Sequence, residues 1–174
     1  MYTKINSQDS LELVTLEQVK RQCNLMESFT MDDEYLNSLI PVCSELAQSY
    51  TKRLLTLGSV TTEVEQYYPQ IILPWGGVES VTEVLIDGVA TTAYTFSDVT
   101  QKVTFASGVR FNNVRITYDC GYPTDKLPKK VTHAVLMMVS TMYRNRDDFI
   151  VGMTVESMPL QSKTLLNGVK YYAA

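Results

Sequence analysis

The segment from Lys129 to Arg146 is apolar around more of its circumference than a helix with one packing partner requires. At about 100° per residue its main stripe forms an ordinary core face, made of Val131, Ala134, Val135, Met138, Val139 and Met142. Leu136 and Tyr143 widen this stripe on one flank and Met137 lies on another side, so the apolar arc spans about 200°, against the ~100° of a single contact. Either a larger monomer core or a neighbouring subunit must cover the surplus.

The length of the chain sets the number of domains. At 174 residues it can bury a core of its own, and we expect one domain over 1–174. The segment Met1–Ser10 has no apolar h-region, and no run of 18 apolar residues occurs, so we expect neither export nor a membrane span. The net charge of −4 disfavours a general nucleic-acid binder, which normally carries a basic face.

The periodicity predicts two helices before a β region. Thr15 and Gln18 match a capping box at the start of a short helix. A longer helix follows Thr30, with acids in its first turn and a bend at Pro41. Its predicted core stripe is Leu36, Leu39, Ile40, Cys43, Leu46, Ala47, Tyr50 and Leu54.

From about Thr61 the period changes to two and β-branched residues dominate, which predicts strands. The predicted strands are Thr62–Tyr68, Gln70–Leu73, Val81–Ile86, Ala93–Phe96, Lys102–Phe105 and Val114–Tyr118. Asp87-Gly88 is a strong hairpin signal and Gly76-Gly77 marks a tight corner, so consecutive strands are expected to be antiparallel.

The predicted fold is therefore α+β: a helical scaffold with an antiparallel β unit inserted between its second and third helices. Along the chain this gives N-terminal helices over 1–58, the β insertion over 61–120, the scaffold helix over 128–147 and a C-terminal arm over 148–174, with a short helix near Pro159–Asn167.

Signatures of catalysis and of cofactor binding are absent from the sequence. No phosphate loop, Gly-x-Ser-x-Gly elbow or His-Glu-x-x-His helix occurs, and His133 is the only histidine. The acids Asp32, Asp33 and Glu34 are explained by the helix dipole rather than by a metal ion. The cysteines Cys23, Cys43 and Cys120 are odd in number and lack Cys-x-x-Cys spacing, which indicates small buried side chains in a reducing compartment. We expect no catalytic, cofactor or metal site.

Several short motifs occur in an order that resembles one known family. They are the Leu13–Lys20 helix lead, the acidic start Asp32–Leu36, the helix end Tyr50-Thr51-Lys52-Arg53, the strand and corner Ile72–Val84, the strand end Val114–Tyr122 and the helix end Met142–Asp147. Together they cover residues 13–148 and resemble the head-to-tail connectors of tailed bacteriophages, the gp6-like adaptor or head-completion proteins. The C-terminus, Leu165–Tyr172, departs from the family's ending.

The resemblance implies a non-enzymatic homo-oligomeric ring, commonly of twelve subunits, in the virion neck. Such a ring is made in the cytoplasm of the bacterial host and docks beneath the portal protein. It joins the head to the next neck or tail-completion protein, and double-stranded DNA passes through its lumen without specific binding. An excess of apolar surface on one helix suits a ring, because each subunit presents two different surfaces to its neighbours.

These considerations select candidate interaction residues. For subunit contacts we expect Leu136, Met137 and Tyr143, with Trp75 as a further interface anchor, because tryptophan is enriched in such anchors. For docking onto the portal or tail we expect Val169, Tyr171 and Tyr172 of an arm that orders on assembly.

Two rival functions stay open at this stage. The main rival is a small nucleic-acid-binding or DNA-processing domain that contacts phosphate through Lys52, Arg53, Lys129 and Lys130. The other is a hydrolase that uses His133 and a nearby acid.

Overall fold

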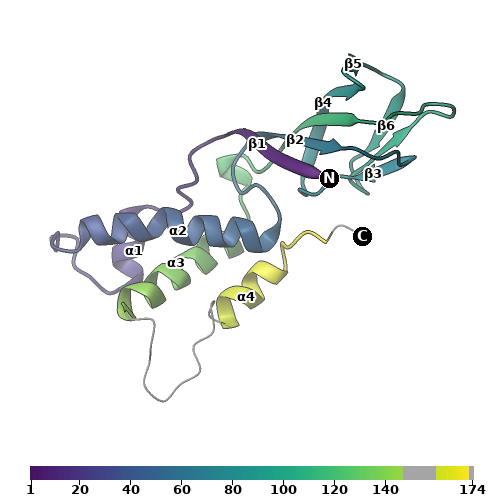
Figure 1. Cartoon of the computed structure of the whole chain (residues 1–174). Helices are drawn as coiled ribbons and strands as arrows, with labels where there is room; N and C mark the ends of the chain where they lie inside the picture. The colour runs from purple at the N-terminus through teal and green to yellow at the C-terminus, as the bar shows by residue number, and fades with distance from the viewer. Residues whose placement is uncertain (147–159, 173–174) are drawn as a thin grey trace. The chain divides into compact units, whose positions relative to one another are not determined.

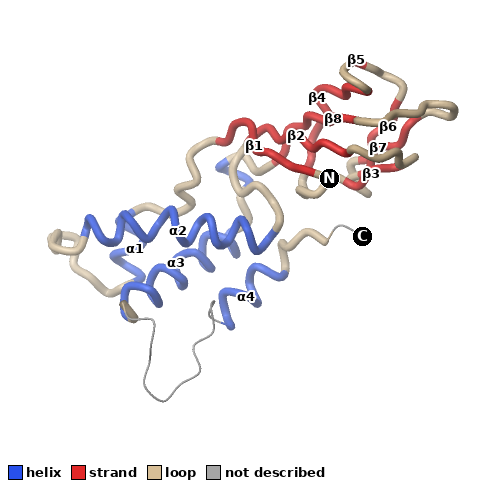
Figure 2. Tube along the Cα trace, viewed as in Figure 1, coloured by secondary structure: helices blue, strands red, loops and turns tan. Residues whose placement is uncertain are grey.

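A computed structural model describes residues 1–146 and 160–172, and the chain forms two compact units (Figure 1). The helical unit comprises residues 11–51 and 127–170, and the β unit comprises residues 1–10, 52–126 and 171–174. The four α-helices belong to the first unit and the described strands to the second (Figure 2). The predicted α+β fold is confirmed, with the sheets between the second and third helices in sequence. That the chain forms a single domain stays a prediction.

The helical unit contains α1 (Leu16–Gln22), α2 (Asp33–Thr51), α3 (Lys129–Arg144) and α4 (Leu160–Asn167). The predicted capping box at α1 is confirmed: the backbone N–H of Gln18 donates to Thr15 Oγ1 at 3.3 Å. In return, the Thr15 N–H donates to Gln18 Oε1 at 2.9 Å. Two N–H groups without helical partners are thereby satisfied, which fixes where α1 begins.

Helix α2 continues through Pro41 and ends at Thr51. Lys52 has a φ of 54°, in the left-handed region, and this conformation stops the helix. The prediction that Leu54 extends the helical stripe is therefore wrong, because Leu54 lies beyond the turn and is buried in the β unit. Leu46 was also predicted to lie in the core, and its 36% exposure contradicts this, since Cys43 and Ala47 occupy the buried face.

Helix α3 is packed against α1, α2 and α4. Its main stripe is buried except for Met142, which is half-buried, and the carbonyl oxygen of Ala134 lies 3.5 Å from Ser162 Oγ of α4. On another side, Cys43 Sγ of α2 lies 3.6 Å from Met142 Sδ. Three helices of the same chain therefore cover much of the broad apolar arc that the sequence analysis left unassigned.

The β unit contains two antiparallel sheets (Figure 1). The strands are β1 (Tyr2–Gln8), β2 (Gly58–Val64), β3 (Gln70–Ile72), β4 (Val78–Ile86), β5 (Val89–Ala90), β6 (Tyr94–Ser97), β7 (Lys102–Phe105) and β8 (Val114–Cys120). One sheet has the order β1-β2-β8-β4-β5 and the other has the order β3-β7-β6. A 3-10 turn, Thr124–Lys126, follows β8.

Strand β1 was not predicted. Its seven residues are polar apart from Tyr2 and Ile5, and six of them are exposed, so no apolar alternation marks it in the sequence. It forms through backbone pairing with β2, from Tyr2 opposite Glu63 to Gln8 opposite Gly58. The predicted strand Thr62–Tyr68 is also corrected, because β2 begins at Gly58, opposite Cys120 of β8.

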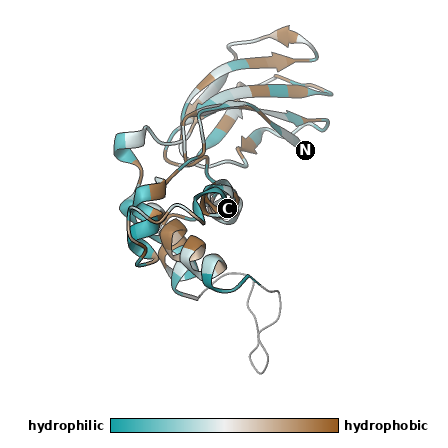
Figure 3. Ribbon diagram, turned by 90° about the vertical axis from the view of Figure 1, so that its left-hand side faces the viewer, coloured by the Kyte–Doolittle hydropathy of each residue, from teal (hydrophilic) through white to brown (hydrophobic). Residues whose placement is uncertain are grey.

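The two sheets share one apolar core. Apolar residues lie along the strands as well as along the helices (Figure 3). In the β unit the core combines Val60, Ile116 and Val84 of the larger sheet with Ile71 and Val103 of the smaller one. The buried hydroxyl of Tyr118 lies 3.1 Å from Thr62 Oγ1, so both polar groups are satisfied inside this core.

Gly121 lies where the chain leaves β8 and tolerates no side chain. Its φ is 116°, and a Cβ at this position would lie 2.1 Å from the backbone oxygen of Thr56. The atoms that this Cβ would meet belong to the backbone of Thr56 and Leu57, so the clash is relieved only by moving the chain. We expect Gly121→Ala to lower the free energy of unfolding by about 3 kcal/mol, measured by urea denaturation.

Gly108 provides the matched control. Its φ of 90° is equally left-handed, but nothing lies within 4 Å of the added Cβ. Gly108→Ala should therefore cost only the conformational strain, about 1 kcal/mol. Equal losses for the two variants would contradict the proposed close contact at Gly121.

Candidate functional site

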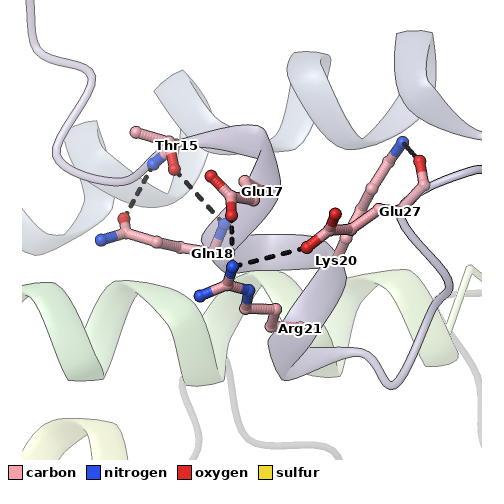
Figure 4. A network of polar contacts seen from close by, with 6 residues as sticks. All are labelled: Thr15, Glu17, Gln18, Lys20, Arg21 and Glu27. Carbon is pink, nitrogen blue, oxygen red and sulfur yellow. Dashed lines mark hydrogen bonds and ion pairs between the residues drawn. The ribbon is translucent and has the colours of Figure 1, made fainter.

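A buried ion pair fixes the connection between α1 and α2. Lys20 is 5% exposed, and its Nζ lies 2.7 Å from Asp33 Oδ1. The same ammonium donates to the backbone oxygen of Glu27 at 3.2 Å (Figure 4). Nearby, Arg21 pairs with Glu17 and with Glu27 on the surface (Figure 4). The acid Asp33 thus does more than complement the dipole of α2, because it neutralises a buried cation.

A second cluster joins the start of α2 to the end of α3. The hydroxyl of Tyr143 donates to Asp32 Oδ2 at 2.6 Å, and Arg146 Nη2 lies 3.3 Å from the same oxygen. The Arg146 guanidinium also lies over the ring of Tyr35, 4.6 Å from its centroid. The hydrogen bond from Tyr143 lowers the pKa of Asp32, and the same bond raises the pKa of Tyr143. Asp32 and Tyr143 therefore fasten two helices together.

The predicted subunit-contact residues of α3 are each partly buried within the chain. Leu136, Met137 and Tyr143 are intermediate in exposure, so each keeps part of its surface in solvent. The Tyr143 ring lies 6.3 Å from that of Tyr35. Their role in subunit contacts stays a prediction.

Tyr171, near the C-terminus, lies in a defined socket of the β unit. Its hydroxyl donates to the backbone oxygen of Leu73 at 3.1 Å, and the Arg53 guanidinium lies 5.7 Å from the ring centroid. The ring fills the space beside Gly76, where an added Cβ would lie 2.5 Å from Tyr171 Cγ. Burial raises the pKa of Tyr171. The chain end is thus held by its own β unit.

Trp75 borders this socket. It is half-buried and lines a shallow hollow of about 320 Å³ together with Thr3, Lys52, Pro74 and Tyr171. The structure therefore brings together Trp75 and Tyr171, which the sequence analysis assigned to separate surfaces. Of the other predicted docking residues, Val169 is half-buried and Tyr172 is 66% exposed.

Among the described residues, no group of three or more His, Cys, Asp or Glu side chains could hold a metal ion. His133 is exposed on α3, and Lys129 and Lys130 are exposed at its start. Burial raises the pKa of the Cys43 and Cys120 thiols to about 12, so both stay protonated. Within the described part of the chain, no helix is long and apolar enough to cross a membrane.

The profile of one protein family matches residues 13–111, more than half of the chain, and its description is phage gp6-like head-tail connector protein. The chain belongs to this connector family. The predicted resemblance is confirmed, and so is the architectural function of a structural adaptor that joins head and tail. The rival of a nucleic-acid-binding or DNA-processing domain is not favoured.

Solved structures give the same fold over almost the whole length of this connector. A chain in the neck of an empty gene transfer agent (GTA) particle, computed with C6 symmetry, has a TM-score of 0.75 at 17% identity. A chain in the neck of a native GTA particle, computed with C12 symmetry, has a TM-score of 0.72 at 15% identity. Each comparison covers 99% of this chain and 96% of the other. A search among curated protein sequences finds no match.

The socket of Tyr171 was not predicted from the sequence. Gly76-Gly77 was predicted to form a tight corner, which the φ of 80° at Gly77 supports, but Gly76 is needed for a different reason. Only a contact with a residue 95 positions later explains why Gly76 has no side chain. A short-range pattern carries no signal for such a contact.

The Asp32 cluster predicts a pH dependence of stability. Because the folded-state pKa of Asp32 lies below its unfolded value, about 3.9, ionised Asp32 stabilises the fold fully above that pH. This contribution disappears as the pH falls through the folded-state pKa. Asp32→Asn should therefore be less stable than the wild type near pH 7, and the difference should shrink toward pH 3, measured by urea denaturation. Tyr143→Phe should also lower the stability near pH 7. A stability difference between Asp32→Asn and the wild type that does not change with pH would contradict this role of the cluster.

The socket predicts coupled effects of two substitutions. Gly76→Ala should expel the Tyr171 ring, and Tyr171→Ala should lower the free energy of unfolding by about 1–2 kcal/mol through lost apolar burial. Trp75 is the only tryptophan, so its fluorescence reports on this site directly. We expect both variants to shift its emission to longer wavelength, with no additional shift in the double variant.

Tyr172→Ala is the control for the socket. Tyr172 is next in sequence but 66% exposed, so its removal should leave the Trp75 emission unchanged. An unchanged emission in Gly76→Ala would show that Tyr171 does not occupy the socket in solution.

Proposed function

We propose that this connector assembles into a homo-oligomeric ring, of twelve copies, in the neck of a phage-type particle. The ring docks on the portal protein at one face and on the next neck or tail-completion protein at the other. Double-stranded DNA passes through its lumen during packaging and ejection. The chain itself catalyses no reaction in this role.

The observation that carries the proposal is the match of the whole chain to neck proteins. The similar chains come from neck structures computed with C6 and C12 symmetry, and the match covers 96% of each of them. Both the helical unit and the β unit therefore have counterparts in a protein of the neck. Family membership, established over residues 13–111, independently supports a position between head and tail.

The charge of the chain suits a channel that lets DNA slide. Each copy carries −4, so twelve copies carry about −48. A net negative ring repels the DNA backbone instead of holding it. Of the candidate phosphate contacts, Arg53 is half-buried beside the ring of Tyr171, whereas Lys52, Lys129 and Lys130 are exposed.

The candidate contact residues are assigned to two kinds of interface, one with neighbouring copies and one with the portal or tail. Leu136, Met137, Tyr143 and Trp75 are half-buried and offer their remaining surface to neighbouring copies. Val169 and Tyr172 are proposed to dock on the portal or tail, and Tyr172 has the more exposed side chain of the two. Tyr171 either keeps its socket and orients Tyr172, or leaves the socket when a partner binds.

Native mass spectrometry tests the ring. The chain has a mass of 19.7 kDa, so a ring of twelve has a mass of about 236 kDa. We expect this species, alone or on addition of the purified portal protein. A chain that stays monomeric and does not bind the portal would overturn the proposal.

Salt dependence of DNA affinity separates the connector from a nucleic-acid binder. A protein that neutralises several phosphates loses affinity steeply between about 50 and 200 mM salt. For this connector we expect little affinity for duplex DNA at either salt concentration, measured by fluorescence anisotropy. Strong binding that falls steeply with salt, and that Lys129→Ala with Lys130→Ala abolishes, would support the rival function.

A further inference from the structure

Among the described residues, the larger sheet of the β unit has two edges that a further strand could join. At one edge, β1 pairs with β2 on its inner side, and six of its seven residues are exposed. Near the other edge, β4 pairs with β8 along its length, but β5 covers it only at Leu85 and Ile86. At the start of β4, the N–H of Val78 donates to Gln101 Oε1 at 2.7 Å and its carbonyl accepts from Gln101 Nε2 at 3.4 Å. Among the described strands, none pairs with the outer edge of β4 from Glu79 to Glu83. Unpaired strand edges carry backbone donors and acceptors that can bind another strand.

The directions of the strands make these two edges complementary. Every pair in the order β1-β2-β8-β4 is antiparallel, so β1 and β4 run in opposite directions. If a second copy continues the sheet in the same orientation, its β4 lies antiparallel to β1 of the first copy. The alternation of strand directions and the polar face of the sheet then both continue from one copy into the next.

Charge favours the same pairing. Strand β1 contains a cation, Lys4, and no acid, whereas β4 contains the acids Glu79 and Glu83 and no cation. Lys4 lies opposite Thr61, and Glu83 lies opposite Thr117. The hydroxyls of Thr61 and Thr117 are 3.0 Å apart, which places Lys4 and Glu83 on the same face of the sheet. Opposite charges on neighbouring strands of one face stabilise their pairing.

Both edge strands carry irregularities in their register. Register shifts occur between Ile5 and Ser7 in β1, and between Val78 and Ser80 and between Val81 and Glu83 in β4. Bulges bend a strand and increase its twist. A head-to-tail contact between two different edges makes a ring when its rotation closes, and a filament when it does not.

We propose that neighbouring copies are joined by antiparallel pairing of β1 from one copy with the Glu79–Glu83 edge of β4 from the next. This inference rests on the proposed ring and names the surface that links its subunits. Lys4 and Glu83 face each other across this junction.

Disulfide trapping tests the junction. Two cysteines are bridged only when their Cα atoms are within about 7 Å. Inside one chain, β1 and β4 are separated by three strand spacings, about 14 Å, so a bridge between them must join two copies. Cys23 is the most exposed native cysteine and is first replaced by serine, while the buried Cys43 and Cys120 are left in place.

Two double variants are made in this background: Lys4→Cys with Glu83→Cys, and Lys4→Cys with Ser80→Cys. They test two registers of strand pairing on the same face of the sheet. After oxidation of the assembled ring, we expect at least one of them to give a reducible ladder of multiples of 19.7 kDa in denaturing electrophoresis. The matched control is Ile5→Cys with Glu83→Cys. Ile5 lies opposite the buried Val60 on the other face of the sheet, so this pair should stay monomeric.

Charge reversal gives a second, independent measurement. Lys4→Glu should raise the midpoint concentration of assembly about 2–5-fold, the range expected for loss of an exposed ion pair, and adding Glu83→Lys should restore it. A ring of the expected mass that shows neither a ladder nor this rescue would overturn the strand junction and leave the connector function intact. Absence of the ring itself would overturn both.

Discussion

The helical unit depends on the burial of the apolar surface of α3 by neighbouring helices. A helix with an apolar arc of about 200° is stable in water only when several partners surround it. The chain supplies three of them, since α1, α2 and α4 all pack against α3. Polar contacts then fix the angles between these helices, through Asp32 with Tyr143 and Arg146 at one place and through Lys20 with Asp33 at another. Folding of this unit therefore requires segments on both sides of the β insertion.

The β unit has a different organisation, because segments from both ends of the chain complete it. The N-terminal residues form β1 at the edge of the larger sheet, and Tyr171 near the C-terminus occupies the socket beside Gly76. These segments carry few apolar residues of their own, so they add little to the core. They determine instead which edges and hollows the unit presents to partners. In a connector this is the decisive property, since its function consists of binding neighbours on several surfaces.

Residues with local signals were predictable from the sequence, and residues with long-range roles were not. The capping box at Thr15, the stripe of α3 and the hairpin at Asp87-Gly88 depend on near neighbours, and each of them is present in the structure. Strand β1 was missed because its pairing with β2 involves backbone groups and leaves no apolar period. Leu54 was misplaced because its period matches α2, although the left-handed turn at Lys52 carries it into another core. The socket of Tyr171 could not be predicted, because a single glycine carries no information about a ring 95 positions later in the chain.

The role of this chain as the adaptor between head and tail is tested most directly by electron microscopy of particles assembled without it. Particles should be produced from a genome in which the coding sequence for this chain is deleted, with the same deletion complemented in trans as control. We expect separate heads and tails in the deletion sample and joined particles in the complemented one. Complete, tailed particles assembled in the absence of this chain would contradict this role.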